Sequence, residues 1–172
     1  MTRTTDIHSG LTANVLREIV QYVPETGKFY WLKSNNQSAV VGGEAGTIEP
    51  KTGYIRFTVL GRKYQAHRLA WLYITGEWPR HQIDHRNLVR SDNWFDNLRQ
   101  ATPSNNMVNK RATKRNILGI KGVSEVSTGR FVARTGLDGK IVHIGSFDTP
   151  QAAHRAYLKK STELHGQFAR GS

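Results

Sequence analysis

Cysteine is absent from the 172 residues of this chain. Disulfide bonds and thiolate zinc sites are therefore excluded, and any metal ion must be held by oxygen or imidazole ligands. Long apolar runs are absent too, since no window approaches the roughly 18 consecutive apolar residues of a membrane span. Residues 1–10 are polar and lack the apolar stretch of a secretory signal. These absences predict a cytoplasmic protein with no membrane partner and no disulfide-linked partner.

Acidic side chains are also scarce, and the chain carries 13 of them against 25 Lys and Arg, a net charge of +12. The imbalance is uneven: residues 1–100 hold 13 basic and 9 acidic side chains, whereas residues 101–172 hold 12 and 4. Most of the second excess lies between Lys110 and Arg134. Such a local concentration indicates a surface for a polyanion, usually a nucleic acid. On charge alone, a merely soluble basic protein is the alternative.

The first half of the chain mixes helix and strand signals. Apolar residues at helical spacing predict a helix over residues 11–23, and Pro24-Glu25-Thr26-Gly27 predicts a turn. Short runs separated by glycines predict strands, followed by a helix that ends at Gly76. The expected strands are residues 28–32, 54–59 and 63–66, and the expected helix is 67–75.

The second half shows a regular alternation of strands and turns. Strands are expected at residues 120–126, 130–137 and 140–147, with the hairpin signal Asp138-Gly139 between the last two. Thr149-Pro150 is a helix start, and Gly166 is a helix end. The fold class predicted for the whole chain is therefore α+β, with a C-terminal three-stranded antiparallel sheet packed on one helix.

Residue types suited to phosphodiester hydrolysis gather at Asp84 and His85. The reaction needs a base to activate water and a cation to neutralise charge, and Asp84 is an oxygen ligand suited to Mg²⁺. Neighbouring side chains on a flat strand point to opposite faces, so this pair can share a site only at a bulge or strand end. Asn97 follows His85 by twelve residues, and Asn106 follows nine later. By spacing alone, these asparagines could equally cap turns.

A set of short motifs surrounds this pair. Its members are His67-Arg68-Leu69-Ala70-Trp71, Ile83-Asp84-His85, Asp92-Asn93, Asn97-Leu98-Arg99-Gln100-Ala101-Thr102 and Asn106, with an upstream run of Leu16-Arg17-Glu18-Ile19, Tyr22, Pro24-Glu25-Thr26-Gly27 and Tyr30-Trp31. In combination they resemble the HNH homing endonucleases common in phages. The resemblance covers roughly residues 13–110.

This resemblance implies a ββα-metal nuclease motif at about residues 67–108. In that motif His85 would be the general base, and Asn97 would orient His85 through a hydrogen bond. Asp84 and Asn106 would hold one divalent cation. Asn106 stands at the third position of the HNH motif, where the name of the motif has His. This favours Mg²⁺ or Mn²⁺ over zinc, because oxygen ligands suit hard cations.

Two features of this region, the loop at residues 86–90 and His67, have alternative interpretations. Relatives usually carry Gly or Asp shortly after the Asp-His pair, whereas this chain has Arg86-Asn87-Leu88-Val89-Arg90. Because this loop is more apolar, the sequence leaves undecided whether residues near the site contact DNA. His67 is expected to be structural, at the start of a buried helix with Trp71, and a role as a ligand is the alternative.

A second resemblance covers nearly all of residues 119–168. It rests on Gly122-Val123-Ser124, Arg130-Phe131-Val132-Ala133-Arg134, Ile144-Gly145-Ser146-Phe147-Asp148-Thr149, Ala152-Ala153, Ala156-Tyr157 and His165-Gly166, which are similar to the AP2 DNA-binding domain. In that family the sheet lies in the major groove. The side chains expected to contact DNA are Lys121, Arg130, Arg134, Lys140 and His143 in the sheet and Lys110, Arg111, Lys114 and Arg115 before it. The alternative is that these side chains are merely solvated.

Taken together, the sequence predicts three segments. Residues 1–108 would contain the nuclease motif, 109–118 would be a basic linker, and 119–168 would be the AP2-like module. The expected function is metal-dependent, site-directed cleavage of double-stranded DNA by a monomer, as in homing, with a nick in one strand as one outcome. The alternatives are a non-catalytic DNA-binding regulator and a structure-specific nuclease.

Overall fold

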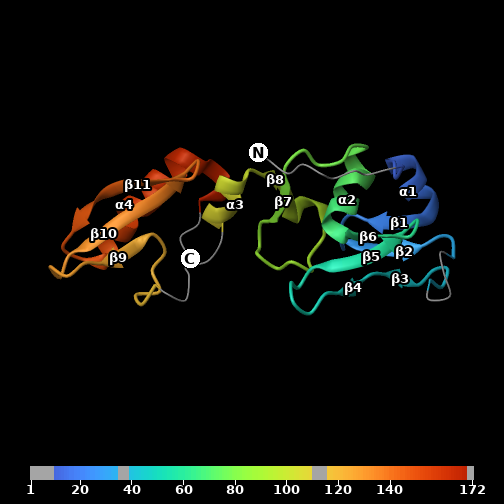
Figure 1. Ribbon diagram of the computed structural model, residues 1–172, viewed down its shortest axis with the longest axis horizontal. Helices are drawn as coiled ribbons and strands as arrows, with labels where there is room; N and C mark the ends of the chain where they lie inside the picture. Colours follow the sequence, from blue (N-terminus) through green and yellow to red (C-terminus); the bar gives the residue numbers. More distant parts are fainter. Residues whose placement is uncertain (1–9, 35–38, 110–115, 170–172) are drawn as a thin grey trace. The chain divides into compact units, whose positions relative to one another are not determined.

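The computed structural model describes residues 10–34, 39–109 and 116–169 (Figure 1). The chain divides into two compact units, residues 1–100 and residues 101–172. Both mix helices with antiparallel strand pairs, which confirms the expected α and β mixture. The sequence-based division at residues 108 and 118 remains a prediction, and the two units are described separately below.

The first unit begins with helix α1 (Ala13–Ile19), which is shorter than expected. The Oγ1 atom of Thr12 caps it by accepting a hydrogen bond from the amide of Val15 at 3.3 Å. The predicted continuation to residue 23 is wrong, because residues 20–23 form strand β1 (Val20–Val23) and pair with strand β2 (Lys28–Trp31). Buried Val20 and Tyr22 flank the exposed Gln21, an alternation of β-branched and aromatic side chains that favours a strand over another helical turn.

Two three-stranded sheets and helix α2 enclose the first core. Strands β1, β2 and β3 (Glu44–Ala45) form one sheet, and strands β4 (Thr47–Ile48), β5 (Ile55–Val59) and β6 (Arg62–Gln65) form the other. Helix α2 (Ala66–Thr75) follows β6 and ends at Gly76, as the glycine predicted. The core includes the aromatic side chains of Tyr22, Phe29 and Phe57. The segment that follows α2 in the chain carries the candidate site residues.

That segment contains a two-stranded sheet. Strand β7 (Gln82–His85) pairs with strand β8 (Leu98–Ala101), and a 3-10 turn, η1 (Phe95–Asn97), immediately precedes β8. The loop between the strands carries most of the polar side chains that the sequence singled out.

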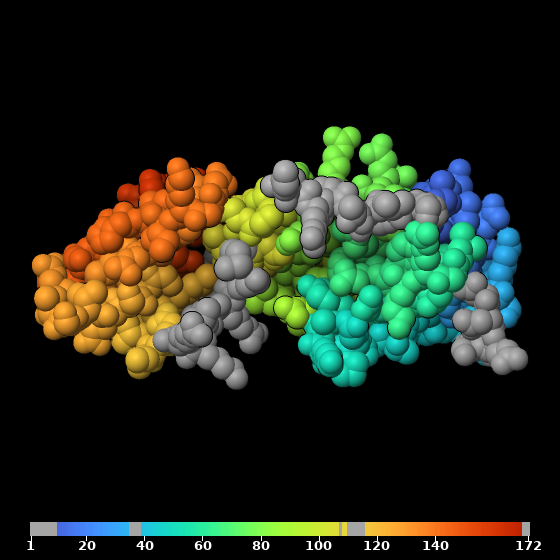
Figure 2. All heavy atoms as spheres, in the orientation of Figure 1, coloured from blue at the N-terminus to red at the C-terminus, as the bar shows by residue number. Residues whose placement is uncertain are grey.

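The second unit begins with helix α3 (Pro103–Asn109) and continues with a three-stranded sheet. Strands β9 (Val123–Glu125), β10 (Phe131–Leu137) and β11 (Lys140–Phe147) follow the order β11-β10-β9. The β10–β11 hairpin occupies much of the unit's face in Figure 2. Helix α4 (Pro150–His165) packs against all three strands, and a 3-10 turn, η2 (Gly166–Phe168), follows it.

Strand β9 is shorter than the expected 120–126 because the chain bends tightly at Gly122. Gly122 has a positive φ of 73°, and a Cβ there would lie 2.1 Å from the ring of Tyr157. Only glycine allows α4 to approach the sheet so closely. No helix in the described stretches of the chain has the length and apolar character that crossing a membrane requires.

Candidate active site

His85 is the last residue of β7, at the strand end that an Asp-His pair requires if both are to serve one site. The chain turns directly after it, with the amide of Leu88 donating to the carbonyl of His85 at 3.0 Å. Both side chains are buried, Asp84 with 5% and His85 with 3% of its surface exposed. Buried ionisable groups that lie close together are candidates for a functional site.

The Asp84 carboxylate is held by Arg99 on the paired strand. Both Nε and Nη2 of Arg99 lie 2.9 Å from Oδ2 of Asp84, and both side chains are buried. This ion pair offsets the cost of burying a carboxylate and fixes its orientation. Arg99 belongs to the motif at residues 97–102, and its place in the sequence alone indicates no role for it.

The ring of His85 faces Asn93, whereas the resemblance implied that Asn97 would orient it. Nε2 of His85 lies 3.2 Å from Oδ1 of Asn93, whose surface is only 1% exposed. Because an amide oxygen only accepts, the tautomer that makes this bond carries its proton on Nε2. Nδ1 is then the basic nitrogen. Asn93, the asparagine of the Asp92-Asn93 motif, therefore has the orienting contact expected of Asn97.

Asn97 instead ties the two ends of the loop together. Its Oδ1 accepts from the amide of Asn87 at 3.0 Å, and its Nδ2 donates to Oδ1 of Asn87 at 3.0 Å and to the carbonyl of Asp92 at 2.7 Å. The predicted hydrogen bond from Asn97 to His85 is thus wrong. The reason is that the oxygen and both N–H donors of this wholly buried amide are directed at the loop backbone and Asn87.

Asn93 itself is fixed by the β1–β2 hairpin. The hydroxyl of Tyr22 donates to the carbonyl of Asn93 at 2.6 Å, and the amide of Phe95 donates to the carbonyl of Pro24 at 2.8 Å. A Cβ at Gly27 would lie 2.2 Å from the backbone carbon of Asn93, so only glycine permits this contact. The upstream Pro-Glu-Thr-Gly turn therefore positions the residue that holds His85.

His67 lies in the same cluster of rings. Its ring packs edge-to-face on His85 with centroids 5.2 Å apart, and it lies 4.9 Å from the ring of Tyr54. Burial lowers the pKa of His67 to about 3, so its imidazole is neutral. Its Nδ1 is buried with no hydrogen-bond partner among the described residues. The expected buried position is observed, and the contact with His85 was not foreseen.

The ionisation of His85 suits a proton acceptor. Burial lowers the pKa of His85 below its usual value of 6.5, while the bond to Asn93 and the charge of Asp84 act in the opposite direction. The net lowering leaves the neutral, basic form dominant near pH 7. A general base must be in this form before it can act.

The apolar loop after His85 contains an uncommon backbone conformation. Leu88 has a φ of +65°, which L-residues other than glycine rarely adopt. Arg90 is anchored, with Nη1 donating to the carbonyl of Thr52 at 2.7 Å and its guanidinium 5.0 Å from the ring centroid of Tyr54. Val89 has 44% of its surface exposed. The loop is thus fixed at Arg90 and presents an apolar side chain to solvent.

The ligand set favours a hydrated hard cation. Within the residues that the structure describes, no group of three His, Cys, Asp or Glu side chains could hold a metal ion. Mg²⁺ retains several water ligands and is commonly held by one or two carboxylates, so Asp84 fits this chemistry. Asn106 is a half-buried residue of α3 in the second unit, where its amide donates to the carbonyl of Thr102 at 2.9 Å.

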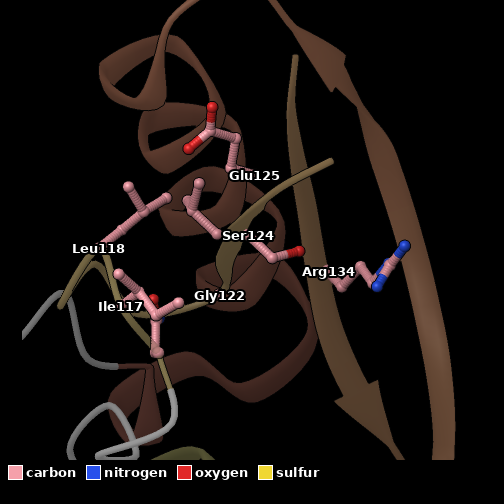
Figure 3. Close-up of a pocket in the computed structure, with 8 residues that line it drawn as sticks. Ile117, Leu118, Gly122, Ser124, Glu125 and Arg134 are labelled. Atoms are coloured by element: carbon pink, nitrogen blue, oxygen red, sulfur yellow. The ribbon is translucent and has the colours of Figure 1, made fainter. Parts of the chain in front are cut away.

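The basic residues expected to contact DNA have different surroundings. Lys110, Arg111, Lys114 and Arg115 lie outside the described residues. Arg134 and Lys140 are exposed, and Arg130 is half exposed beside Asp148, with Nη2 and Oδ1 3.4 Å apart. In Figure 3 the side chain of Arg134 extends away from Ile117 and Leu118, which line a cavity of about 470 Å³. Arg134 also pairs across the hairpin with the exposed His143.

Lys121 corrects the expected set. Only 8% of its surface is exposed, and its ammonium donates to the carbonyl of Val108. A buried side chain already engaged with backbone is not placed to contact phosphate. Sequence alone could not reveal this, because the burial of Lys121 depends on α3 packing over it.

Comparison with known proteins agrees with the chemistry of this cluster. Residues 64–108 match the model of a family described as HNH endonuclease, so the similarity is to nuclease enzymes. The chain is also 35% identical over 121 residues to a mimivirus protein, the uncharacterized HNH endonuclease L560 of Acanthamoeba polyphaga mimivirus. The aligned part covers 69% of this chain and 62% of that relative, less than two thirds of its length. No solved structure matches the chain.

Proposed function

We propose that this chain is a metal-dependent endonuclease that hydrolyses phosphodiester bonds in double-stranded DNA. The observation that carries the proposal is His85, a buried imidazole with a lowered pKa, held by Asn93 and adjacent to a fixed carboxylate. This cluster falls inside the segment that matches HNH endonucleases.

Each residue of the cluster has its own proposed role in hydrolysis. Asn93 holds the ring of His85 with the proton on Nε2, and Nδ1 removes the proton from the attacking water. Asp84, oriented by Arg99, and Asn106 are the proposed ligands of one Mg²⁺ or Mn²⁺ ion. When bound, the cation supplies positive charge for the scissile phosphate and the leaving oxygen. Asn97 links the two ends of the loop between β7 and β8, and this keeps Asn93 within hydrogen-bond distance of His85.

The second unit supplies the proposed DNA-reading surface. Arg134 and His143 are cross-strand neighbours on the sheet, and Arg130 and Lys140 lie at the ends of the same hairpin. Arginine reads guanine through two hydrogen bonds, whereas contacts to phosphate give affinity for any sequence. Such a surface supports cleavage at a chosen site, as in homing, and one active site in a monomer would cut one strand per encounter.

The direct test is digestion of supercoiled plasmid carrying the DNA that flanks the coding region. With Mg²⁺ or Mn²⁺ we expect nicked circles or one linear product, and with EDTA no cleavage. Asp84→Asn should move the cation requirement to higher concentration, because the carboxylate charge is lost. Cleavage that persists in EDTA, or an unchanged cation titration for Asp84→Asn, would contradict the proposal.

A further inference from the structure

Helix α3, which carries the proposed ligand Asn106, packs within the second unit against β10 and η2 (Figure 1). The module expected only to read DNA therefore also contacts the helix that belongs to the nuclease motif. Three hydrogen bonds that each involve a side chain make this contact specific, one near the C-terminal end of the helix and two toward its start.

The bond at the C-terminal end comes from Lys121. Its ammonium donates to the carbonyl of Val108, in the last turn of α3. The last carbonyls of a helix have no partner within the helix and carry partial negative charge, so a cation is favoured there. A lysine that is 92% buried must be compensated by such contacts, because an uncompensated buried charge is very costly.

The other two bonds lie toward the start of the helix. The amide of Asp138, in the β10–β11 turn, donates to Oγ of Ser104 at 3.1 Å. The ring Nδ1 of His165, the last residue of α4, lies 3.2 Å from Oδ1 of Asn105 and donates to it. The sheet, its hairpin turn and the end of α4 thus each hold a different residue of α3.

These contacts use one face of the helix. At about 100° per residue, Ser104, Asn105 and Val108 fall within roughly one third of the circumference, and Asn106 lies about 150° from their centre. The helix is consequently fixed to the module by one side, while Asn106 lies on the other. Rotation of α3 about its axis would therefore move Asn106 as well.

We propose that the C-terminal module is a positioning element of the nuclease, and that Lys121, Ser104 and His165 are the residues through which it holds the metal-binding helix. This inference rests on the proposed function, since it takes Asn106 to be a cation ligand. Residues that orient metal ligands typically change metal affinity by about 10–100-fold when they are replaced. The module then does more than select the DNA sequence.

The test uses full-length protein and the substitution Lys121→Met, which removes the ammonium and keeps the apolar stem. Lys159→Met is the matched control, because Lys159 is an exposed residue of α4. Amide hydrogen exchange without metal is measured for residues 103–109 and for the sheet residues 131–147. We expect exchange in α3 to rise about tenfold in Lys121→Met, as for the loss of a charge-assisted hydrogen bond, with the sheet unchanged. The control should match the wild type.

The second readout is the Mg²⁺ concentration for half-maximal plasmid cleavage. It should rise about tenfold or more in Lys121→Met, with DNA affinity in EDTA unchanged, and Lys121→Arg should restore part of the loss. Ser104→Ala, which removes one neutral hydrogen bond, should change both readouts in the same direction by a smaller factor and serves if Lys121→Met fails to fold.

The outcomes separate the two proposals. If the wild type never cleaves DNA, the proposed function fails, while hydrogen exchange still tests the anchoring of α3. If α3 exchanges as in the wild type in both Lys121→Met and Ser104→Ala, the anchoring is overturned. If α3 loosens but the Mg²⁺ titration of an active enzyme does not move, the positioning role of the module is overturned.

Discussion

The two units treat their polar side chains in opposite ways. The first buries His67, Asp84, His85, Asn93 and Asn97 almost completely and satisfies most of their polar atoms within the chain. The second leaves the cationic side chains of its β10–β11 hairpin open to solvent, with Arg134 and Lys140 as the clearest cases. Among the described residues of the second unit, Lys121 and His165 depart from this pattern, and both are buried and contact α3, a helix of the nuclease motif.

The difference fits what each proposed task requires. A general base needs one tautomer, one orientation and a controlled pKa, and buried hydrogen bonds provide all three. A DNA-reading surface needs charges that can reach bases and phosphates, so burial would defeat it. Substitutions in the first unit should therefore affect folding and rate, and those on the exposed sheet should affect DNA affinity.

The largest effect on stability is expected for Asn97→Ala. It removes three hydrogen bonds and leaves the Asn87 amide and the Asp92 carbonyl without this partner. At about 1–3 kcal/mol for an unsatisfied buried group, the free energy of unfolding should fall by about 3 kcal/mol. Asn14→Ala, at an exposed position, should change it by less than about 0.5 kcal/mol in the same urea titration. Equal effects would show that burial and hydrogen bonding do not set the contribution of Asn97 to stability.

Arg134→Ala should weaken binding of the preferred duplex by about 1–3 kcal/mol if Arg134 reads a base. The loss should be confined to one position of the target, because the remaining contacts are unchanged. Binding of duplexes with single substitutions, measured in EDTA at fixed salt, checks this. A uniform loss over all sequences would assign Arg134 to a phosphate contact instead.

Asn93→Ala should lower the cleavage rate by about tenfold or more, because the ring of His85 loses the partner that fixes its tautomer. The bond to Asn93 raises the pKa of His85, so its loss should lower that pKa further. The active form is the deprotonated one. Activity is therefore lost as pH falls through the pKa, and this acidic limb should move to lower pH in the variant. A limb that stays in place would separate Asn93 from the ionisation of His85.

The smallest effect is expected for Leu88→Gly. The positive φ of Leu88 is strained for leucine and relaxed for glycine, although glycine also loses more entropy on folding. The free energy of unfolding should rise by roughly 0.5 kcal/mol. Val89→Gly, which has no positive φ to relieve, should instead lower it. Thermal unfolding of both variants under the same conditions tests the contrast.

Signals confined to a few neighbouring residues predicted structure well. Asp138-Gly139 and Thr149-Pro150 correctly marked the hairpin and the start of α4, because each acts through its own backbone conformation. The end of α1 was missed because Val20 belongs to a strand only through pairing with β2. Apolar spacing alone cannot show such a partner.

The sequence indicated which residue types form the candidate site, but it did not indicate which of them contact one another. Asp84 and His85 were singled out as candidates, and both are buried, but spacing could not show whether Asn93 or Asn97 faces the His85 ring. That choice depends on the loop and on Tyr22, which is 71 residues distant in the chain from Asn93. The burial of Lys121 likewise depends on α3 and has no signature in the sequence around it.

The most direct test of this division of work is the single-turnover cleavage rate at saturating protein, measured on one duplex with Mg²⁺ for His85→Ala and Arg134→Ala. We expect His85→Ala to lose about 10²–10⁴-fold, as for removal of a general base. Arg134→Ala should remain within about threefold of the wild type, because saturation removes the cost of weaker binding. Wild-type cleavage by His85→Ala, or a comparable loss in Arg134→Ala, would contradict the assignment of chemistry to the first unit and recognition to the second.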